Sequence, residues 1–355
     1  MKIWTFSIAL TFILSLISCS DEGVENYIPT PSPLQIPQLF QDKILNPIIP
    51  LDNPQTMEGI ILGKKLFFDP ILSADNSQSC AHCHAPENAF SDADRFSDGI
   101  NGKLGNRNSM PLFNLAWNYN ETFFWDGNTF SLEHQAFVPV SNPNEMGSNW
   151  KQVEDKLQNH NEYPNLFNLA FGTSTIDSTL VTKAIAQFER TLISSNSKFD
   201  KFLRGEITLA PEEQNGFDVF MDENRGDCFH CHGSDNNPLW TDNLFHNNGL
   251  DTNPTDLGLG QATGDPADNG KFKTPSLRNL AFTSPYMHDG RFATLEEVIN
   301  HYSEGLKNSP TIDPLMKKVS QGGVQLSAQD KADLKTFLLS LSDYEFISTP
   351  AFLNQ

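Results

Sequence analysis

Two short segments of this chain share the pattern Cys-x-x-Cys-His, which is the attachment motif of a c-type haem. The residues are Cys80, Cys83 and His84 in the first segment and Cys228, Cys231 and His232 in the second. Each thiol adds to one vinyl group of the porphyrin, and the adjoining histidine becomes an axial ligand of the iron. A single copy would also fit a zinc knuckle or a redox dithiol. Two copies, both ending in Cys-His, favour two covalently bound haem c groups, with His82 and His230 as solvent-side spacers.

The fifth cysteine, Cys19, follows a short apolar segment at the N-terminus. Lys2 and the apolar residues 3–17, which are too few to span a membrane, are typical of a signal peptide. The ending Leu-Ile-Ser-Cys resembles a lipoprotein box, so we predict a lipoprotein signal peptide at 1–19 and a lipid on Cys19. The alternatives are an ordinary signal peptide with an incidental cysteine, or a single transmembrane anchor. Residues 20–45 are rich in proline and predict an extended tether.

Haem is attached to thiols outside the bacterial cytoplasm, so we expect an extracytoplasmic protein. It would be periplasmic or in the cell envelope, held by lipid to the outer membrane. The rest of the chain is long enough for two domains, predicted at 46–205 and 206–345, with a tail at 346–355. The net charge of -20 argues against nucleic acid and against electrostatic binding to anionic lipid. It favours a basic partner such as a small soluble cytochrome.

Similar sequences precede both haem motifs, at residues 63–69 and 216–222, with aromatic and aliphatic residues at helical spacing. This internal duplication predicts the same plan in each half: a helix, a haem motif, a ligand-bearing loop and a closing helix. Ser327 and Asp330 form a capping pair for the last helix, and another amphipathic helix is predicted over 179–194. Strand-like alternation is scarce, so we expect a mostly α fold with long irregular loops.

The sixth position of each iron decides whether a haem transfers electrons or binds a substrate. Three further motifs bear on this: Phe-Trp-Asp-Gly at 124–127, Thr-Pro-Ser-Leu-Arg-Asn at 274–279 and Thr-Ser-Pro-Tyr-Met-His-Asp-Gly at 283–290. In this order they resemble the bacterial dihaem cytochrome c peroxidase family, which includes MauG, and the resemblance covers about residues 46–342. It implies two cytochrome c-like domains, the first with the peroxidatic haem and the second with the electron-transfer haem.

The resemblance assigns roles to four residues between the haem motifs. Trp125 would mediate electron transfer between the haems, Gln135 and Glu145 would be the distal glutamine and acid–base glutamate, and Pro139 would shape the pocket. A carboxylate above the iron can take the proton from the inner peroxide oxygen and return it to the outer one, which makes the leaving group water. Taken singly, the tryptophan would be a core aromatic, the glutamine a helix-surface amide and the glutamate a charge at a helix N-terminus.

The chain departs from most dihaem peroxidases in the loop after the first haem motif. That loop usually carries a histidine that blocks the peroxidatic haem until the other haem is reduced. Here no histidine occurs between His84 and His134. We therefore expect the His84 haem to be five-coordinate and open without prior reduction.

A second departure concerns the other haem, whose distal ligand in the peroxidases is a methionine fourteen residues beyond the histidine of the Pro-Tyr-x-His segment. Counting from His288 leads to Tyr302, and a tyrosine here resembles the ligand of the second haem in MauG. A phenolate is a harder donor than a thioether and lowers the reduction potential. His301 and Met287 are the competing ligands, in that order. His288 is expected to form hydrogen bonds, either structural or to a haem propionate, rather than to bind iron.

The resemblance also implies a calcium ion between the haem domains. The family binds it with an asparagine side chain and two backbone carbonyls, and Asn108, Thr283 and Pro285 stand at the matching places. Oxygen ligands and waters suit calcium. Many relatives are dimers, so a homodimer is a further expectation from the resemblance.

The sequence thus predicts an oxidoreductase that reduces hydrogen peroxide with electrons from a donor protein. One alternative is a MauG-like enzyme that uses peroxide to oxidise a partner protein at long range. Tyr302 and the missing blocking histidine favour this alternative, whereas Gly226 stands where MauG has a surface tryptophan. The other alternative is an electron carrier without catalysis, and Glu145 argues against it.

Overall fold

The computed structural model describes residues 27–354. The predicted signal peptide 1–19, the lipidated Cys19 and the start of the predicted tether lie outside the described residues. Within the described part of the chain, no helix is both long and apolar enough to cross a membrane.

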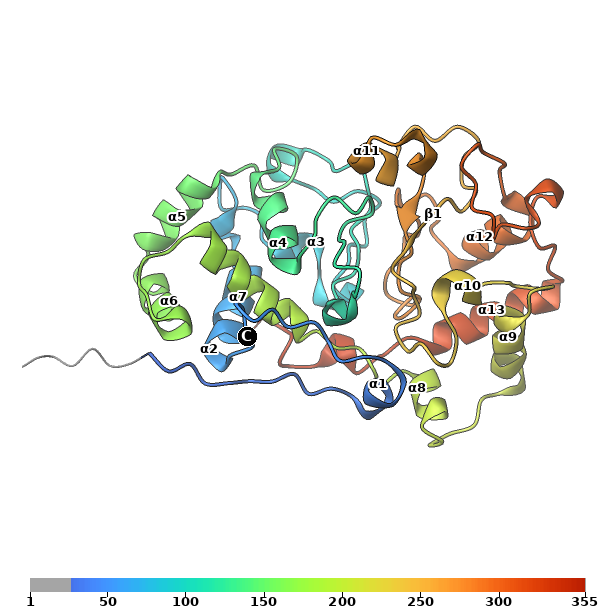
Figure 1. Ribbon diagram of the computed structural model, residues 1–355, viewed down its shortest axis with the longest axis horizontal. Coiled ribbons are helices and arrows are strands. Elements are labelled where there is room, and N and C mark those ends of the chain that lie inside the picture. The colour runs from blue at the N-terminus through green and yellow to red at the C-terminus, as the bar shows by residue number, and fades with distance from the viewer. Residues whose placement is uncertain (1–26, 355) are drawn as a thin grey trace, which may run out of the picture.

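The described chain is mostly helical, as expected, with long irregular connections and one small antiparallel pair of strands (Figure 1). The helices are α1 Gln38–Lys43, α2 Met57–Phe68, α3 Cys80–Cys83, α4 Leu132–Ser141, α5 Trp150–Gln158, α6 Tyr163–Phe171, α7 Ser178–Arg190, α8 Lys198–Leu203, α9 Pro211–Met221, α10 Phe229–His232, α11 Leu259–Thr263, α12 Leu295–Asn300 and α13 Ala328–Ser340. The strands are β1 Phe245–His246 and β2 Phe272–Lys273. Several 3₁₀ turns and one π-helical turn, His301–Gly305, complete the elements.

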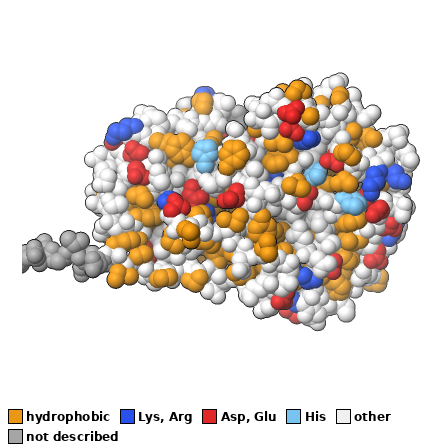
Figure 2. Space-filling view, viewed as in Figure 1, with side chains coloured by type: hydrophobic (Ala, Val, Ile, Leu, Met, Phe, Trp, Pro, Cys, Tyr) orange, Lys and Arg blue, Asp and Glu red, His pale blue; other side chains and the backbone are white. Residues whose placement is uncertain are grey.

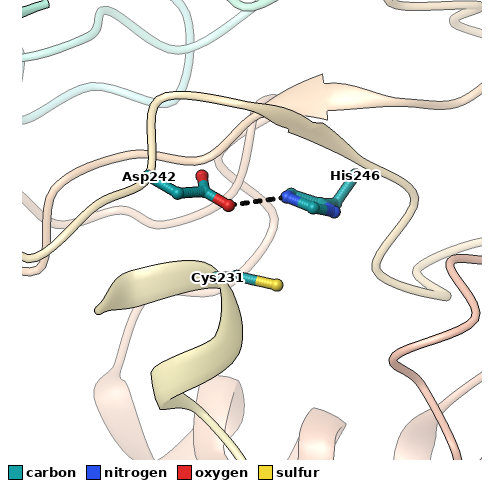
Figure 3. Close-up of side chains that lie close together, drawn as sticks. All are labelled: Cys231, Asp242 and His246. Carbon is teal, nitrogen blue, oxygen red and sulfur yellow. Dashed lines mark hydrogen bonds and ion pairs between the residues drawn. The ribbon is translucent and has the colours of Figure 1, made fainter. Parts of the chain in front are cut away.

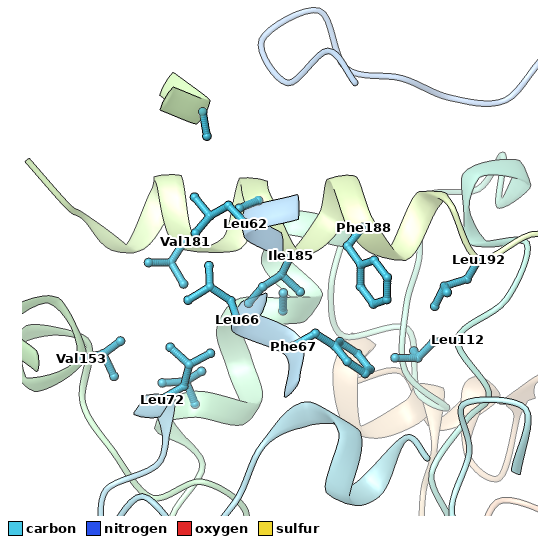
Figure 4. Packing of buried hydrophobic residues seen from close by; sticks show 14 of the residues in the cluster. Leu62, Leu66, Phe67, Leu72, Leu112, Val153, Val181, Ile185, Phe188 and Leu192 are labelled. Atoms are coloured by element: carbon cyan, nitrogen blue, oxygen red, sulfur yellow. The ribbon is translucent and has the colours of Figure 1, made fainter. Parts of the chain in front are cut away.

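The core of the first half forms where α2 packs against α7 (Figure 4). Leu62 and Leu66 lie one turn apart on α2 and meet Ile185 and Phe188 of α7, all of them buried. Gly63 is required at this crossing, because a Cβ there would fall on a backbone carbonyl of α7. The helix predicted over 179–194 is therefore confirmed in type, although it ends at Arg190.

The second half repeats this arrangement with α9 and α13, which form its most extensive helix pair. Val219 and Phe220 of α9 pack against Leu334 and Phe337 of α13. Gly216 plays the same part as the glycine of α2, since a Cβ would meet a backbone carbonyl of α13. The two similar sequences before the haem motifs are thus both helices, each crossing a long helix at a glycine. Ser327 caps α13 as predicted, accepting from the Asp330 amide.

Both ends of the described chain pack onto the body of the molecule (Figure 1). In α1, within the segment predicted as tether, Phe40 is fully buried and its ring meets Trp117 edge-on, with the ring centroids 5.1 Å apart. In the segment predicted as tail, Phe346 is buried against Phe90 and Phe113 of the first half. Residues 27–45 and 346–354 therefore contribute to packing, because aromatic side chains at these positions find apolar surface.

Candidate active site

The first haem motif ends in a histidine whose ring is held by the following loop. His84 follows α3 directly, and its Nδ1 lies 3.0 Å from the Phe90 carbonyl oxygen. Burial lowers the pKa of His84, which favours the neutral imidazole that binds iron. An Nδ1–H bonded to a carbonyl leaves Nε2 as the ligand atom and fixes the orientation of the ring.

The predicted distal residues come from α4 and the turn that follows it. Gln135 and Pro139 lie four residues apart and hence on one face of α4. Beyond the helix the chain turns back, with the Met146 amide donating to the Pro139 carbonyl over 3.3 Å. This turn places Glu145 close to the first haem motif, where its negative charge helps burial to raise the pKa of Cys83 to about 11.

Glu145 is held by one short hydrogen bond, from Asn142 Nδ2 to its Oε1 over 2.7 Å. Burial raises the pKa of this carboxyl group, so it keeps a proton at higher pH than an exposed glutamate. The Gln135 side chain is buried nearby on α4, and its carbonyl oxygen has no hydrogen-bond partner among the described residues. An unpaired buried amide oxygen is unusual and marks a place where a bound group or water would complete the structure.

The loop without a histidine packs directly against the Glu145 turn. Ile100 donates from its amide to the Glu145 carbonyl over 2.8 Å, and Lys103 Nζ donates to the Pro143 carbonyl over 2.9 Å. Gly99 allows this approach, because a Cβ there would fall on the Asn144 carbonyl. The loop therefore positions the backbone of the predicted acid–base residue.

Trp125 connects the two halves of the molecule. Its Nε1 donates to the Asn108 carbonyl of the first half over 2.8 Å, and its own carbonyl accepts from the Lys273 amide of β2 over 2.9 Å. The side chain is buried and lines a large cavity of the second half. Trp125 is therefore hydrogen-bonded to both halves, and its place between the two haems stays a prediction.

The second haem motif lines a cavity of about 1720 Å³, the open space at its mouth included. Cys228, Cys231 and His232 contribute one wall, and Tyr302 and Met287 also line the cavity. Burial lowers the pKa of His232 to about 4, and within the described residues its Nδ1 has no hydrogen-bond partner.

The three candidates for the second haem's distal ligand are placed differently. Tyr302 and Met287 both line the cavity, and burial raises the pKa of Tyr302 to about 12. His301 is not among the described residues that line it, because its Nε2 is directed to the Asn248 carbonyl at 3.2 Å. Tyr302 and Met287 thus both face the cavity, whereas His301 does not line it, and ligation by Tyr302 stays a prediction.

The predicted calcium residues Asn108, Thr283 and Pro285 also line this cavity. Asn108 is fixed by two hydrogen bonds, from its amide to the His288 carbonyl over 2.7 Å and from Nδ2 to the Asp94 carbonyl over 3.1 Å. The His288 ring stacks on Phe272, with ring centroids 3.6 Å apart, and its expected role as a hydrogen-bonding residue stays a prediction. Calcium binding by these three residues remains a prediction.

Similarity to known proteins agrees with this geometry. A family model described as di-haem cytochrome c peroxidase matches residues 57–208. Over 297 residues the chain is 36% identical to the methylamine utilization protein MauG of Methylophilus methylotrophus, covering 82% of this chain and 84% of the relative. Over 260 residues it is 35% identical to the cytochrome c551 peroxidase of Nitrosomonas europaea, covering 71% and 75%. The chain belongs to the dihaem cytochrome c peroxidase and MauG family.

A solved structure supports the same assignment across nearly the whole chain. The crystal structure of a MauG-like protein associated with microbial copper homeostasis matches with a TM-score of 0.81 at 35% identity, covering 90% of this chain and 98% of that one. As a member of this dihaem peroxidase family, the protein is an oxidoreductase that acts on peroxide. The family also implies two haem c groups.

The described residues fit these dihaem peroxidase cofactors. Both motifs present two half-buried thiols and one half-buried imidazole, and the second set faces the large cavity. The side chain of Lys273 lines the same cavity, and burial lowers its pKa to about 8. A buried cation of this kind suits the carboxylates that a haem carries.

One polar cluster of the dihaem site was missed by the sequence analysis. His246 of β1 lies 2.9 Å from Asp242 and 2.6 Å from Asp313, and Cys231 lies beside them (Figure 3). Hydrogen bonds to Asp242 and then to Asp313 raise the pKa of His246 to about 8. With both ring nitrogens bonded to carboxylates, the histidine ties β1 to the loop around residue 313. The aspartate four residues before the histidine was the only sequence signal, and it is a weak one.

Proposed function

We propose that this protein reduces hydrogen peroxide to water with electrons from a donor protein such as a small cytochrome, and that its first haem reacts without prior reduction. The observation that carries the proposal is Glu145, a half-buried carboxyl group next to the first haem motif, on a turn that a histidine-free loop holds in place. The cytochrome c551 peroxidase of Nitrosomonas europaea, a relative at 35% identity, supports a cytochrome as donor.

The residues of the first site divide the work of O–O bond cleavage. A haem held by Cys80, Cys83 and His84 would supply the iron chemistry for binding peroxide at its inner oxygen. Glu145 Oε takes the proton from that oxygen and returns it to the outer oxygen, so that water leaves. Asn142 holds the carboxylate for this transfer, and Gln135 offers its unpaired carbonyl oxygen to the peroxide hydrogen.

Electrons reach the first site through the second. Trp125 provides an aromatic path between the halves, since it is bonded to Asn108 on one side and Lys273 on the other. Tyr302 and His232 would hold the second haem, since both line one cavity. Phenolate ligation would give this haem a low reduction potential.

Further parts of the proposal concern the setting of the enzyme. We propose an extracytoplasmic protein, periplasmic or in the cell envelope, held to the outer membrane by lipid on Cys19. One calcium ion would bind Asn108, Thr283 and Pro285, which line the same cavity. A homodimer remains an expectation from the family.

The test is stopped-flow optical and EPR spectroscopy of the diferric holoprotein mixed with hydrogen peroxide. The resting protein should show one high-spin ferric haem, which should react with peroxide directly, and reduced cytochrome c should then be oxidised. Two low-spin ferric signals at rest, with no peroxide reaction before reduction, would contradict the proposal.

Tyr302 favours a second candidate function, because a tyrosine at this position resembles the ligand of the second haem in MauG. The enzyme would then use peroxide to oxidise residues of a partner protein at long range. Gly226 stands where MauG has a surface tryptophan, so this chain would not use the same surface residue to oxidise a partner. A side chain at this position would meet the Val219 carbonyl and the sulfur of Cys228. Slow turnover of reduced cytochrome c, together with long-lived oxidised enzyme after peroxide, would select this function.

A further inference from the structure

We propose that Asn248 is a positioning residue that selects the distal ligand of the second haem. Its side-chain nitrogen Nδ2 donates to Tyr302 Oη over 3.1 Å and lies 3.5 Å from Met287 Sδ. Its backbone carbonyl holds His301 at 3.2 Å. This single asparagine therefore contacts all three side chains that could compete for the iron. The proposal rests on the proposed ligation by Tyr302.

The residues on both sides of Asn248 are hydrogen-bonded to the loop at 307–313. Asn247 is almost fully buried, and its Nδ2 donates to Ser309 Oγ over 3.0 Å and to Thr311 Oγ1 over 2.9 Å. On the other side the Gly249 carbonyl accepts from the Lys307 amide over 2.7 Å. Because its neighbours are fixed, Asn248 can place its carboxamide at a defined point in the cavity wall.

That wall separates the haem cavity from a second, polar cavity between the two halves. Asn248 lines both cavities, together with the stacked pair Phe272 and His288. The polar cavity is lined by charged side chains that include Arg95, Asp256 and Arg291. Asn248 thus donates a hydrogen bond to Tyr302 from a part of the wall that also contains the stacked rings of Phe272 and His288.

The two acceptors of Asn248 differ in strength. A phenol or phenolate oxygen accepts hydrogen bonds well, whereas a thioether sulfur is a weak acceptor. A phenolate oxygen bound to iron still has a lone pair that can accept the Asn248 amide hydrogen. The hydrogen bond is therefore compatible with Tyr302 as the iron ligand and favours Tyr302 in that role. His301 is not available to bind the iron, because its ring nitrogen is hydrogen-bonded to the backbone carbonyl of the same asparagine.

The experiment compares holoproteins with Asn248→Leu, Asn248→Ser and the matched control Asn106→Leu, an exposed asparagine on the polar cavity only. Resonance Raman and EPR spectra report phenolate or thioether ligation, and titration gives the potential of the second haem. Asn248→Leu should show a mixture in which part of the haem is thioether-ligated. Asn248→Ser, which can still donate to oxygen, should recover much of the phenolate signature, and Asn106→Leu should match the parent.

A second background isolates the hydrogen bond from ligand exchange. In Met287→Leu the thioether is absent, so Tyr302 alone remains in contact with Asn248. Adding Asn248→Leu to this background should lower the potential of the second haem, because a phenolate that loses a hydrogen-bond donor gives more electron density to iron.

The outcomes separate the two proposals. If the parent shows phenolate ligation but Asn248→Leu leaves spectra and potential unchanged in both backgrounds, the role of Asn248 is overturned and ligation by Tyr302 stands. If the parent shows no phenolate signature, ligation by Tyr302 fails, and the selecting role of Asn248 fails with it.

Discussion

Glu145 is distinguished from other carboxylates of this acidic chain by its surroundings. It is half-buried beside the first haem motif, with one amide donor to its carboxylate and a loop fixed to its backbone. Burial disfavours the charged form, and the hydrogen bond from Asn142 only partly offsets this, so its pKa is raised above the ordinary 4.5. A carboxyl group tuned in this direction works as acid and base closer to neutral pH.

We therefore predict that Glu145→Gln lowers the rate of reaction with peroxide by about 10² to 10⁴-fold. In the parent, the rate should fall as pH drops through the raised pKa, because a protonated carboxyl group cannot accept the peroxide proton. This acid limb should disappear in the variant. Stopped-flow rates between acid and neutral pH measure both effects, and the resting EPR spectrum is the control for an intact haem. An unchanged rate would remove the catalytic role.

Residues could be predicted from the sequence where chemistry fixes local spacing. The haem thiols and histidines lie within five consecutive positions, and the distal residues keep their spacing along α4 and its turn. Asn248 could not be found in this way, because its partners Met287 and Tyr302 come 39 and 54 residues later. An Asn-Asn-Gly sequence by itself indicates only a turn.

At the scale of elements, the internal duplication was the most informative pattern. The helices before both haem motifs could be predicted from their spacing, and the structure adds that a glycine permits each crossing. The positions of α1 and Phe346 could not be predicted, since a proline-rich start and a short tail contain no periodicity that says where they pack. The positions of these two segments depend on tertiary contacts with the rest of the molecule.

The crossing of α9 and α13 makes a sharp test. Gly216→Ala should lower the free energy of unfolding of the holoprotein by about 2 kcal/mol, because the added Cβ must push α13 away. Helix propensity acts in the opposite direction by about 1 kcal/mol, so a net loss identifies the close approach. Urea unfolding followed by circular dichroism gives the value. Gly105→Ala is the matched control, since the nearest atom to its Cβ would be 3.7 Å away, and equal effects would contradict the packing argument.

For the whole molecule, the decisive feature is the contact between the two halves. Asp and Glu side chains are found on both lobes of the face in Figure 2, interspersed with hydrophobic side chains. The net charge of -20 therefore does not mark a single docking patch on that face. Between the halves, by contrast, charge is organised: Arg107 of the first half binds Asp256 of the second with two hydrogen bonds of 2.7 and 2.8 Å.

Arg107 also binds Asp126, next to Trp125, over 2.6 Å, and it precedes Asn108, the acceptor of the tryptophan Nε1. Its side chain is 16% exposed, so removing it leaves two carboxylates poorly solvated and unpaired. This guanidinium therefore both joins the halves and supports the residue proposed to relay electrons between them.

Arg107→Met should accordingly lower the free energy of unfolding of the holoprotein by about 2 to 4 kcal/mol and slow electron transfer between the haems after peroxide is added. Arg107→Lys keeps the charge but not the forked geometry, so it should recover only part of both losses. The control is Arg95→Met, whose side chain is 55% exposed and whose ion pair with Asp289 should be worth at most about 1 kcal/mol. Urea unfolding and stopped-flow spectroscopy measure the two quantities. If Arg107→Met costs no more than Arg95→Met, the two halves are held together by their apolar contacts instead.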